Sequence, residues 1–305
     1  MKLMQHLRRT MAKAEERPPQ YVSTLSSPVA LLVPEGFPND VIVSSFMKNE
    51  VIRVHGNGTM RIFAKGVYCD EKMGACHALD GPWGLAQLDD ELFISSFSTD
   101  SILVFNINKP HDFLCAFGGS HVLDSPEGLE IGPNDGMLYI VSYLTNSVVV
   151  FEPRSRRFVR EFASAMSGPE DLAFLPDGSL LVSQHWGNSV YMYDGQGKHV
   201  QTFSNLTVGP AFNDCFPVGV IVYSDDSFFV SCQGERNTIL SVSMKEQSAH
   251  EVISARRHCR APGGMGWLGP RQHKTTLAVL AYTSSAICVF NATQEKGRWK
   301  FVSSI

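Results

Sequence analysis

The stretch SPEGLEIGPNDGMLYIVSYLTNSVVVF, from Ser125 to Phe151, decides the fold of this chain. It reads as an apolar strand, a Pro-Asn-Asp-Gly turn, a second apolar strand, a polar turn containing Asn, and a third strand with alternating apolar residues. Three consecutive antiparallel strands are therefore predicted. Glu127 stands between Pro126 and Gly128 at the start of the first strand. The stretch is either a single unit with an isolated glutamate, or one copy of a repeat whose turn holds a functional carboxylate.

The same pattern recurs along the chain, so the stretch is one copy of a repeat. Six units begin at Pro28, Pro82, Pro126, Pro169, Pro217 and Pro262. The steps are 54 residues (28 to 82), 44 (82 to 126), 43 (126 to 169), 48 (169 to 217) and 45 (217 to 262). A weaker fourth strand follows the third, as in RFVREFA and WKFVSSI. The sequence therefore predicts six units of four antiparallel strands with almost no helix.

The need to bury these sheets selects the fold. A four-stranded sheet cannot bury both faces by itself, and a radial arrangement lets each sheet pack on its neighbours while shielding its edges. We therefore predict an all-β fold, a six-bladed β-propeller over residues 28–305 closed by face packing, with a β-sandwich as the alternative. Residues 1–27 are predicted to be an N-terminal extension, partly disordered or sealing the ring. Residues 67–81 exceed the repeat and are predicted to form a loop on the rim.

Composition excludes several classes of function. The formal net charge is −4 and carries no basic excess, so nucleic acid is not an expected partner. No run approaches the ~20 apolar residues that span a bilayer, so no membrane contact is expected. The N-terminus lacks the apolar run of a secretory signal, which predicts a cytoplasmic location.

The seven cysteines are an odd number without a regular spacing, and they are predicted to be reduced thiols. Cys69 and Cys76 fall in the extra segment, and their spacing matches no familiar zinc site. They are predicted to be two thiols of the rim loop.

The repeats resemble a known group of propellers. PEGLEIGPNDGMLYIVSYLTNSVVVF and PEDLAFLPDGSLLVSQHWGNSVYMYD are similar to NHL repeats and to blades of the gluconolactonase (senescence marker) and virginiamycin B lyase propellers. The likeness covers residues 28–305. It implies the propeller fold, but not one activity, because these families range from binding modules to metal-dependent hydrolases and lyases.

Candidate site residues follow from strand direction. The start of the innermost strand and the end of the second strand lie at the same end of an antiparallel blade, and hence at one mouth of the central channel. The side chains predicted to bind a ligand there are Trp83, Tyr143, Gln184, Trp186, Gln233 and Tyr282. The turns also supply carboxylates to the same mouth.

Glu127, Glu170 and Asp171 are the predicted metal ligands, because carboxylate oxygens suit Ca²⁺ or Mg²⁺. The resemblance to lactonase-like propellers implies metal ligands at this turn position, usually Asn or Asp on several blades and a Glu on the first. This sequence departs from that pattern, because Trp83 and its counterparts Val218 and Gly263 cannot coordinate a metal, and Glu35 follows its strand. The alternative role for the glutamates is capping of the turn's own N–H groups.

His185 is the candidate catalytic residue, since an imidazole beside Glu170 is suited to general acid or base chemistry near neutral pH. The resemblance to lyase-like propellers also implies a histidine that acts together with a glutamate. The alternative is that His185 and Trp186 form a polar and aromatic lid, hydrogen-bonded to the next blade.

Two functions remain. The first is a binding scaffold that holds a peptide, a protein or a small ligand at the channel mouth. The second is a divalent-metal-dependent hydrolase or lyase that uses the same mouth. The missing metal ligands favour the first.

Overall fold

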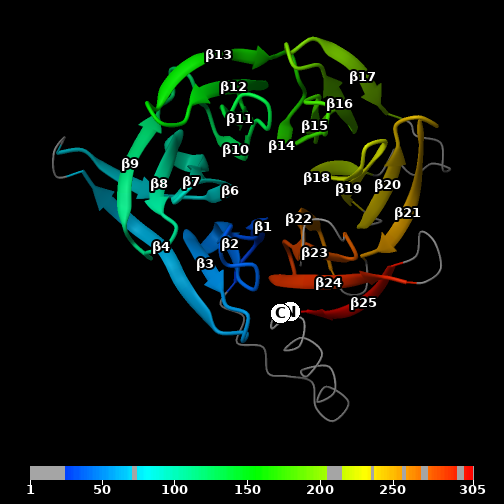
Figure 1. Ribbon diagram of the computed structural model, residues 1–305, viewed down its shortest axis with the longest axis horizontal. Helices are drawn as coiled ribbons and strands as arrows, with labels where there is room; N and C mark the ends of the chain where they lie inside the picture. The colour runs from blue at the N-terminus through cyan, green and yellow to red at the C-terminus, as the bar shows by residue number, and fades with distance from the viewer. Residues whose placement is uncertain are drawn as a thin grey trace.

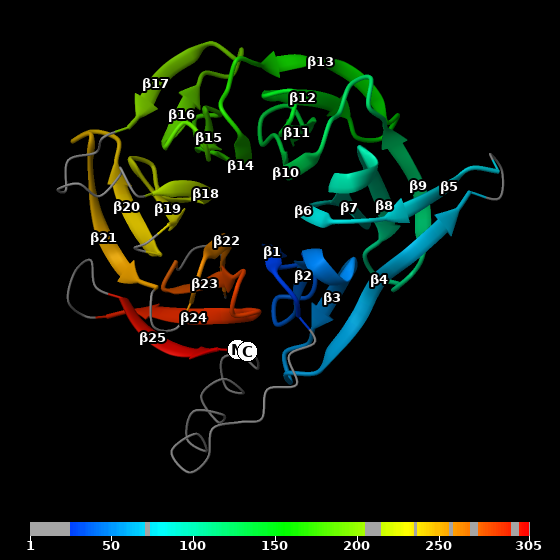
Figure 2. The same ribbon diagram turned by 180° about the vertical axis from the view of Figure 1, so that it is seen from behind.

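The protein is a six-bladed β-propeller, as the repeat predicts (Figure 1). The computed structural model describes residues 25–70, 74–204, 215–234, 237–255, 259–268, 274–293 and 299–304. Six antiparallel sheets stand around a central channel, and the view from behind shows the same ring (Figure 2). The prediction for the N-terminal extension falls mostly on residues 1–24, which lie outside the described residues.

Each blade is a meander whose innermost strand comes first in the sequence. Blade 1 contains β1 (Pro28–Leu32), β2 (Val41–Ser45), β3 (Glu50–Val54), β4 (Met60–Cys69) and β5 (Cys76–Leu79). Blade 2 contains β6 (Pro82–Leu88), β7 (Glu91–Ser96), β8 (Ser101–Asn106) and β9 (Phe113–Gly118). Blade 3 contains β10 (Pro126–Ile131), β11 (Leu138–Ser142), β12 (Ser147–Glu152) and β13 (Arg157–Ala163).

The second half of the chain repeats this order. Blade 4 contains β14 (Pro169–Phe174), β15 (Leu180–Gln184), β16 (Ser189–Tyr193) and β17 (His199–Phe203). Blade 5 contains β18 (Phe216–Ser224), β19 (Ser227–Gln233), β20 (Thr238–Ser243) and β21 (Ser248–Ser254). Blade 6 contains β22 (Pro262–Trp267), β23 (Thr276–Ala281), β24 (Ala286–Ala292) and β25 (Trp299–Ser304). Two short 3₁₀ turns, Phe46–Lys48 and Phe97–Thr99, follow β2 and β7, and no described helix is long and apolar enough to cross a membrane.

The hydrophobic core lies between the blades, because the second strand of each sheet is buried on both faces along nearly its whole length. Six clusters of buried apolar side chains fill the ring. One of them joins Val43 and Ile52 of blade 1 to Leu280 and Val289 of blade 6. The ring is therefore closed by face packing between complete blades, and β1 lies beside β22 (Figure 1).

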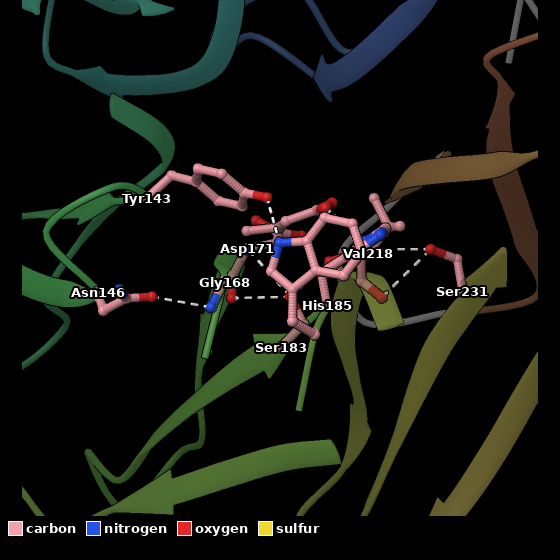
Figure 3. Close-up of polar contacts among 11 residues, drawn as sticks. Tyr143, Asn146, Gly168, Asp171, Ser183, His185, Val218 and Ser231 are labelled. Atoms are coloured by element: carbon pink, nitrogen blue, oxygen red, sulfur yellow. Dashed lines mark hydrogen bonds and ion pairs between the residues drawn. The ribbon is translucent and has the colours of Figure 1, made fainter. Parts of the chain in front are cut away.

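The Asn and Asp residues of the sequence turns join successive blades. Asn49, Asp100, Asn146 and Asn237 all have positive φ, and each side chain accepts a hydrogen bond from a backbone N–H before the next blade. Asn146 Oδ1, for example, accepts from Gly168 N at 2.9 Å (Figure 3). At the closure, Ser285 Oγ accepts from Ser27 N at 3.4 Å. These bonds fix the loop that leads into each innermost strand, which explains why the turn residue recurs with the repeat.

The extra segment of blade 1 is a hairpin, and the prediction of a rim loop was wrong in this respect. β4 continues past the blade and pairs with β5, with Cys69 opposite Cys76. Tyr68 on this hairpin stacks on Phe113 of blade 2, with ring centroids 5.4 Å apart. The segment forms strands because its alternating residues find an apolar surface on the neighbouring blade.

The prediction that all cysteines are reduced was also wrong. Cys69 is bonded to Cys76, and Cys215 is bonded to Cys232, while Cys115, Cys259 and Cys288 form no disulfide. Disulfides persist mainly in oxidising compartments. The cytoplasmic location therefore stays a prediction, and the two disulfides do not support it.

Thiol counting tests this pairing. In denaturant without reductant, iodoacetamide should label three of the seven cysteines, and after reduction it should label all seven, as read by mass spectrometry. The variant Cys69→Ser should expose Cys76 as a fourth thiol. Labelling of all seven cysteines before reduction would show that neither disulfide forms.

Candidate functional site

Two sets of equivalent positions line one mouth of the channel. The residues that follow the starting prolines are Val29, Trp83, Glu127, Glu170, Val218 and Gly263, and the residues that end or directly follow the second strands are Phe46, Phe97, Tyr143, His185, Gln233 and Tyr282. The strand register brings the two sets together, since each starting proline pairs with the residue just before the second-set residue of its blade, as Pro126 does with Ser142 before Tyr143. In blade 4, His185 N then donates to Gly168 O at 2.7 Å (Figure 3).

Two buried carboxylates occupy this mouth on neighbouring blades. Glu127 of blade 3 is 2% exposed and Glu170 of blade 4 is 7% exposed. Burial, and then the charges of Glu170 and Asp171, raise the pKa of Glu127 well above its usual range. Burial also raises the pKa of Glu170, although the neighbouring imidazole of His185 opposes the shift.

His185 and Glu170 form a close pair. Nδ1 of the imidazole lies 2.6 Å from Oε1 of the carboxylate, and both side chains are largely buried. The His185 ring also stacks on Phe216, with centroids 5.2 Å apart. A buried pair of an imidazole and a carboxylate can exchange a proton with a bound ligand, which is the chemistry that the sequence suggested for His185.

An aromatic arc borders the two carboxylates. We define the aromatic arc as Phe46, Trp83, Phe97, Tyr143, Trp186 and Phe216, which come from five successive blades. Neighbouring rings have centroids 5.2 Å (Phe46 and Trp83), 5.8 Å (Trp83 and Phe97), 6.4 Å (Phe97 and Tyr143) and 6.4 Å (Trp186 and Phe216) apart. The arc therefore offers a ligand several aromatic faces and edges in one place.

A hydrogen bond from Trp186 Nε1 to the Tyr143 hydroxyl, 2.5 Å long, completes the arc between blades 3 and 4 (Figure 3). The indole remains 62% exposed. Burial, and with a smaller effect the charges of Glu127 and Glu170, raise the pKa of Tyr143, while the bond from Trp186 lowers it. The phenol is therefore close to both acids.

Two further predicted residues have roles inside the protein. Asp171 Oδ2 accepts a hydrogen bond from Val220 N at 3.0 Å, so this carboxylate links the innermost strands of blades 4 and 5. Gln184 is fully buried, and its Oε1 accepts a hydrogen bond from Ser167 N at 2.8 Å. In blade 3 the equivalent bond runs from Asp124 N to Ser142 Oγ. Gln233 and Tyr282 lie at the mouth positions of blades 5 and 6, half-buried.

Two aromatic residues of the site were missed by the sequence analysis. Phe46 could have been found, because Ser44, Ser45 and Phe46 repeat the Ser-Ser-Phe of Ser95 to Phe97 at the end of the second strand. Phe216 precedes a blade's starting proline, where no other blade carries an aromatic residue, so no repeated pattern pointed to it.

Buried serines hold the mouth in place. In four blades a serine of the second strand donates across the blade interface to the carbonyl of a mouth residue. The pairs are Ser44 with Trp83 (2.6 Å), Ser95 with Glu127 (2.8 Å), Ser183 with Val218 (2.5 Å) and Ser231 with Gly263 (2.7 Å). Because these hydroxyls are buried and satisfied, the mouth residues are fixed through their main chain.

The donor set of a metal-dependent propeller does not fit this mouth. At the six equivalent strand positions, only Glu127 and Glu170 have side-chain oxygens that could bind a metal. Asp171 Oδ2 already accepts a hydrogen bond from Val220 N. Within the described residues, no group of three or more His, Cys, Asp and Glu side chains could hold a metal ion. Ca²⁺ takes six to eight oxygen ligands. We therefore derive no step through a metal, and the metal ligands stay a prediction.

A cavity continues from the mouth into the channel. Its volume is about 710 Å³, and it is lined by the innermost strands of all six blades. Trp83 and Glu170 line it near the mouth, and Glu130 and Lys274 line it further along the strands. Lys274 Nζ donates to the carbonyls of Val222 and Tyr223, which keeps this ammonium at the opposite end from Glu127.

Comparison with known proteins identifies the class of fold. No protein-family model and no curated protein matches this sequence. Among solved structures, virginiamycin B lyase from Staphylococcus aureus matches with a TM-score of 0.63 and 14% identity, over 90% of this chain and 84% of the lyase. A putative gluconolactonase matches with a TM-score of 0.65 and 16% identity, over 86% of this chain and 88% of that chain.

A chain of a nidogen and laminin complex is also similar, with a TM-score of 0.61 and 14% identity, over 78% of this chain and 83% of that chain. The predicted resemblance to these propellers is thus confirmed for the fold. The identities are too low for the likeness to carry activity or ligands.

Proposed function

We propose that this propeller is a binding protein that holds a peptide or a small ligand at the channel mouth. The observation that carries the proposal is the aromatic arc, which borders two buried carboxylates and includes the 62% exposed indole of Trp186. Trp and Tyr side chains that are rigidly held supply most of the energy in many binding sites. Serine hydrogen bonds fix the main chain of the mouth, so little order has to be gained when a ligand binds.

Structurally similar propellers have been solved both with a small molecule and in a protein complex. One of them is a catalytically inactive virginiamycin B lyase solved with Quinupristin, and another belongs to a nidogen and laminin complex. These ligands belong to those proteins. They support the proposal only in that similar propellers are found with a small molecule and with a protein.

A ligand screen tests the proposal. Compounds from a library of short peptides and small aromatic molecules should raise the melting temperature of the wild-type protein by mass action. The same compounds should have little effect on Trp186→Ala, because that variant lacks the exposed ring of the arc. Phe158→Ala is the matched control, since Phe158 is exposed on the outer strand β13. Hits that stabilise Trp186→Ala as well as the wild type would contradict binding at the mouth.

The alternative is an enzyme, a hydrolase or a lyase, and the close pair of His185 and Glu170 favours it. In that function His185 carries a proton to or from the substrate and Glu170 orients the imidazole. Turnover of a panel of lactones and esters that disappears in His185→Ala would establish it. A rise in melting temperature with Ca²⁺ or Mg²⁺ that EDTA reverses and Glu127→Gln abolishes would establish the metal-dependent form.

A further inference from the structure

One carboxylate oxygen of the mouth, Oε2 of Glu127, is buried without a hydrogen-bond partner among the described residues. The Glu127 side chain is 2% exposed. A buried polar atom that is left unpaired costs free energy, and more so if it is charged. The native structure retains such an atom mostly where a ligand, an ion or a proton completes it. Within the described part of the chain, Glu127 is therefore the carboxylate of the mouth that lacks a partner.

The partner has to be cationic or a strong donor. Glu127 and Glu170 stand on neighbouring blades, and the charge of Glu170 acts on Glu127. The basic side chains that form ion pairs in the described part of the chain, such as Arg53 with Asp40 and Arg156 with Glu91, do so away from this mouth. At the mouth, the imidazole of His185 lies against Glu170, with Nδ1 2.6 Å from Oε1 of the carboxylate. In the part of the chain that the structure describes, the two carboxylates therefore lack a positively charged partner for Glu127.

The surroundings select the kind of cation. A hard divalent metal needs more oxygen ligands than the mouth offers. Aromatic rings attract organic cations instead, through the negative face of the ring. The charges of Glu127 and Glu170 both act on Tyr143. The rings of Phe97 and Trp186 adjoin Tyr143, and Trp83 adjoins Phe97, so this arc would cover the apolar body of such a ligand. Carboxylates next to aromatic rings are the chemistry that recognises an ammonium group.

We propose that the channel mouth binds a protonated organic amine with an aromatic or apolar body, its ammonium group between Glu127 and Glu170 and its body against the aromatic arc. The inference rests on the proposed binding function and names its ligand class. The 62% exposed indole of Trp186, which is hydrogen-bonded to Tyr143 and lies against the rings of His185 and Phe216, is the exposed face of the arc for this body.

Calorimetric titration with phenethylamine tests the proposal, with 2-phenylethanol as the neutral molecule of the same shape. At pH 7, phenethylamine should bind the wild-type protein at least tenfold more tightly than the alcohol. In Glu127→Gln, which keeps the shape and removes the charge, the affinity for the amine should fall to that for the alcohol. Glu161→Gln, on the outer strand β13, is the control and should bind as the wild type does.

The outcomes separate this inference from the proposed function. If both probes bind equally, and Trp186→Ala abolishes binding while Glu127→Gln does not, the mouth is a binding site but the amine preference is wrong. If 2-phenylethanol binds better, or neither probe binds at millimolar concentration, the amine proposal is overturned as well. If Trp186→Ala and Glu127→Gln both bind the amine as the wild type does, the amine is held elsewhere and both proposals fail.

Discussion

The variant Gly84→Ala is expected to destabilise the propeller by about 3 kcal/mol, although it adds only one methyl group. A Cβ atom at Gly84 would lie 2.2 Å from the carbonyl oxygen of Glu127 and 2.9 Å from Leu129 N, both in the innermost strand of the next blade. Main-chain atoms of a packed strand cannot move aside as a flexible side chain can. The expected result is therefore a large drop in the urea midpoint of unfolding, followed by tryptophan fluorescence.

Gly195→Ala is the matched control for this experiment. A Cβ atom at Gly195 would meet nothing closer than Gly178 O at 3.9 Å, so the substitution should change stability by less than about 0.5 kcal/mol. The Glu127 carbonyl accepts from Ser95, so Gly84→Ala should also weaken ligand binding at the mouth. Equal midpoints for the two variants would show that the blades do not converge at Gly84.

The same contact explains why the sequence repeats Pro-x-Gly, and hence why the fold could be predicted. A Cβ atom at Gly128 would approach Asp171, and one at Gly219 would approach Gly263 O at 2.6 Å. Each glycine marks the place where an innermost strand meets the next blade. Four of the six blades carry glycine at this position, as Gly84, Gly128, Gly219 and Gly264, while blade 1 has Ala30 and blade 4 has Asp171, so the pattern is visible in one sequence.

The site was less predictable, because side-chain direction at the mouth does not follow strand alternation. The register of β14 against β15 shifts between Pro169 and Leu172, which is where Glu170 and Asp171 stand. Alternation therefore could not show that Glu170 meets His185 while Asp171 turns to Val220 N. The sequence placed both acids at the mouth, but their partners depend on the neighbouring blade.

The disulfide between Cys215 and Cys232 could not be predicted from the sequence, because it also depends on how equivalent positions of the blades correspond. Cys215 and Cys232 hold the two positions that Asp124 and Ser142 hold in blade 3, where a hydrogen bond joins Asp124 N to Ser142 Oγ. A covalent bond thus replaces a hydrogen bond at one of the equivalent positions. Counting and spacing of cysteines cannot reveal this, because the relation appears only when the blades are superimposed.

The second large effect is a fall in the free energy of unfolding as pH rises, and it originates in carboxylic acids that face the channel. Burial, and then the charge of Asp171, raise the pKa of Glu130 to about 8, although Phe174 N donates to this carboxylate and opposes the shift. Burial raises the pKa of Asp171 to about 7. Glu127 and Glu170 shift in the same direction. Glu130 and Asp171 therefore hold protons in the native state at a pH where the unfolded chain has already released them.

The sign of the effect follows from proton binding. Between the unfolded pKa values, near 4, and the native values, near 7 to 8, the native state holds more protons than the unfolded state, so stability decreases as pH rises. The stabilisation is fully present below the unfolded pKa values. Glu130 is partly exposed to the channel, so we expect a loss on the order of 2–3 kcal/mol between pH 5 and 8 rather than the full value of the shifts.

Urea unfolding at pH 5, 6, 7 and 8 measures this slope. In Glu130→Gln the slope should become clearly shallower, because the amide oxygen still accepts from Phe174 N but no proton is exchanged. Glu152→Gln should keep the wild-type slope, since hydrogen bonds from Ser155 and Arg154 lower the pKa of Glu152 and leave it ionised over this whole range. A wild-type stability that stays constant or increases from pH 5 to 8 would mean that the channel acids are ionised in the native protein, and that water or a counterion reaches them along the channel.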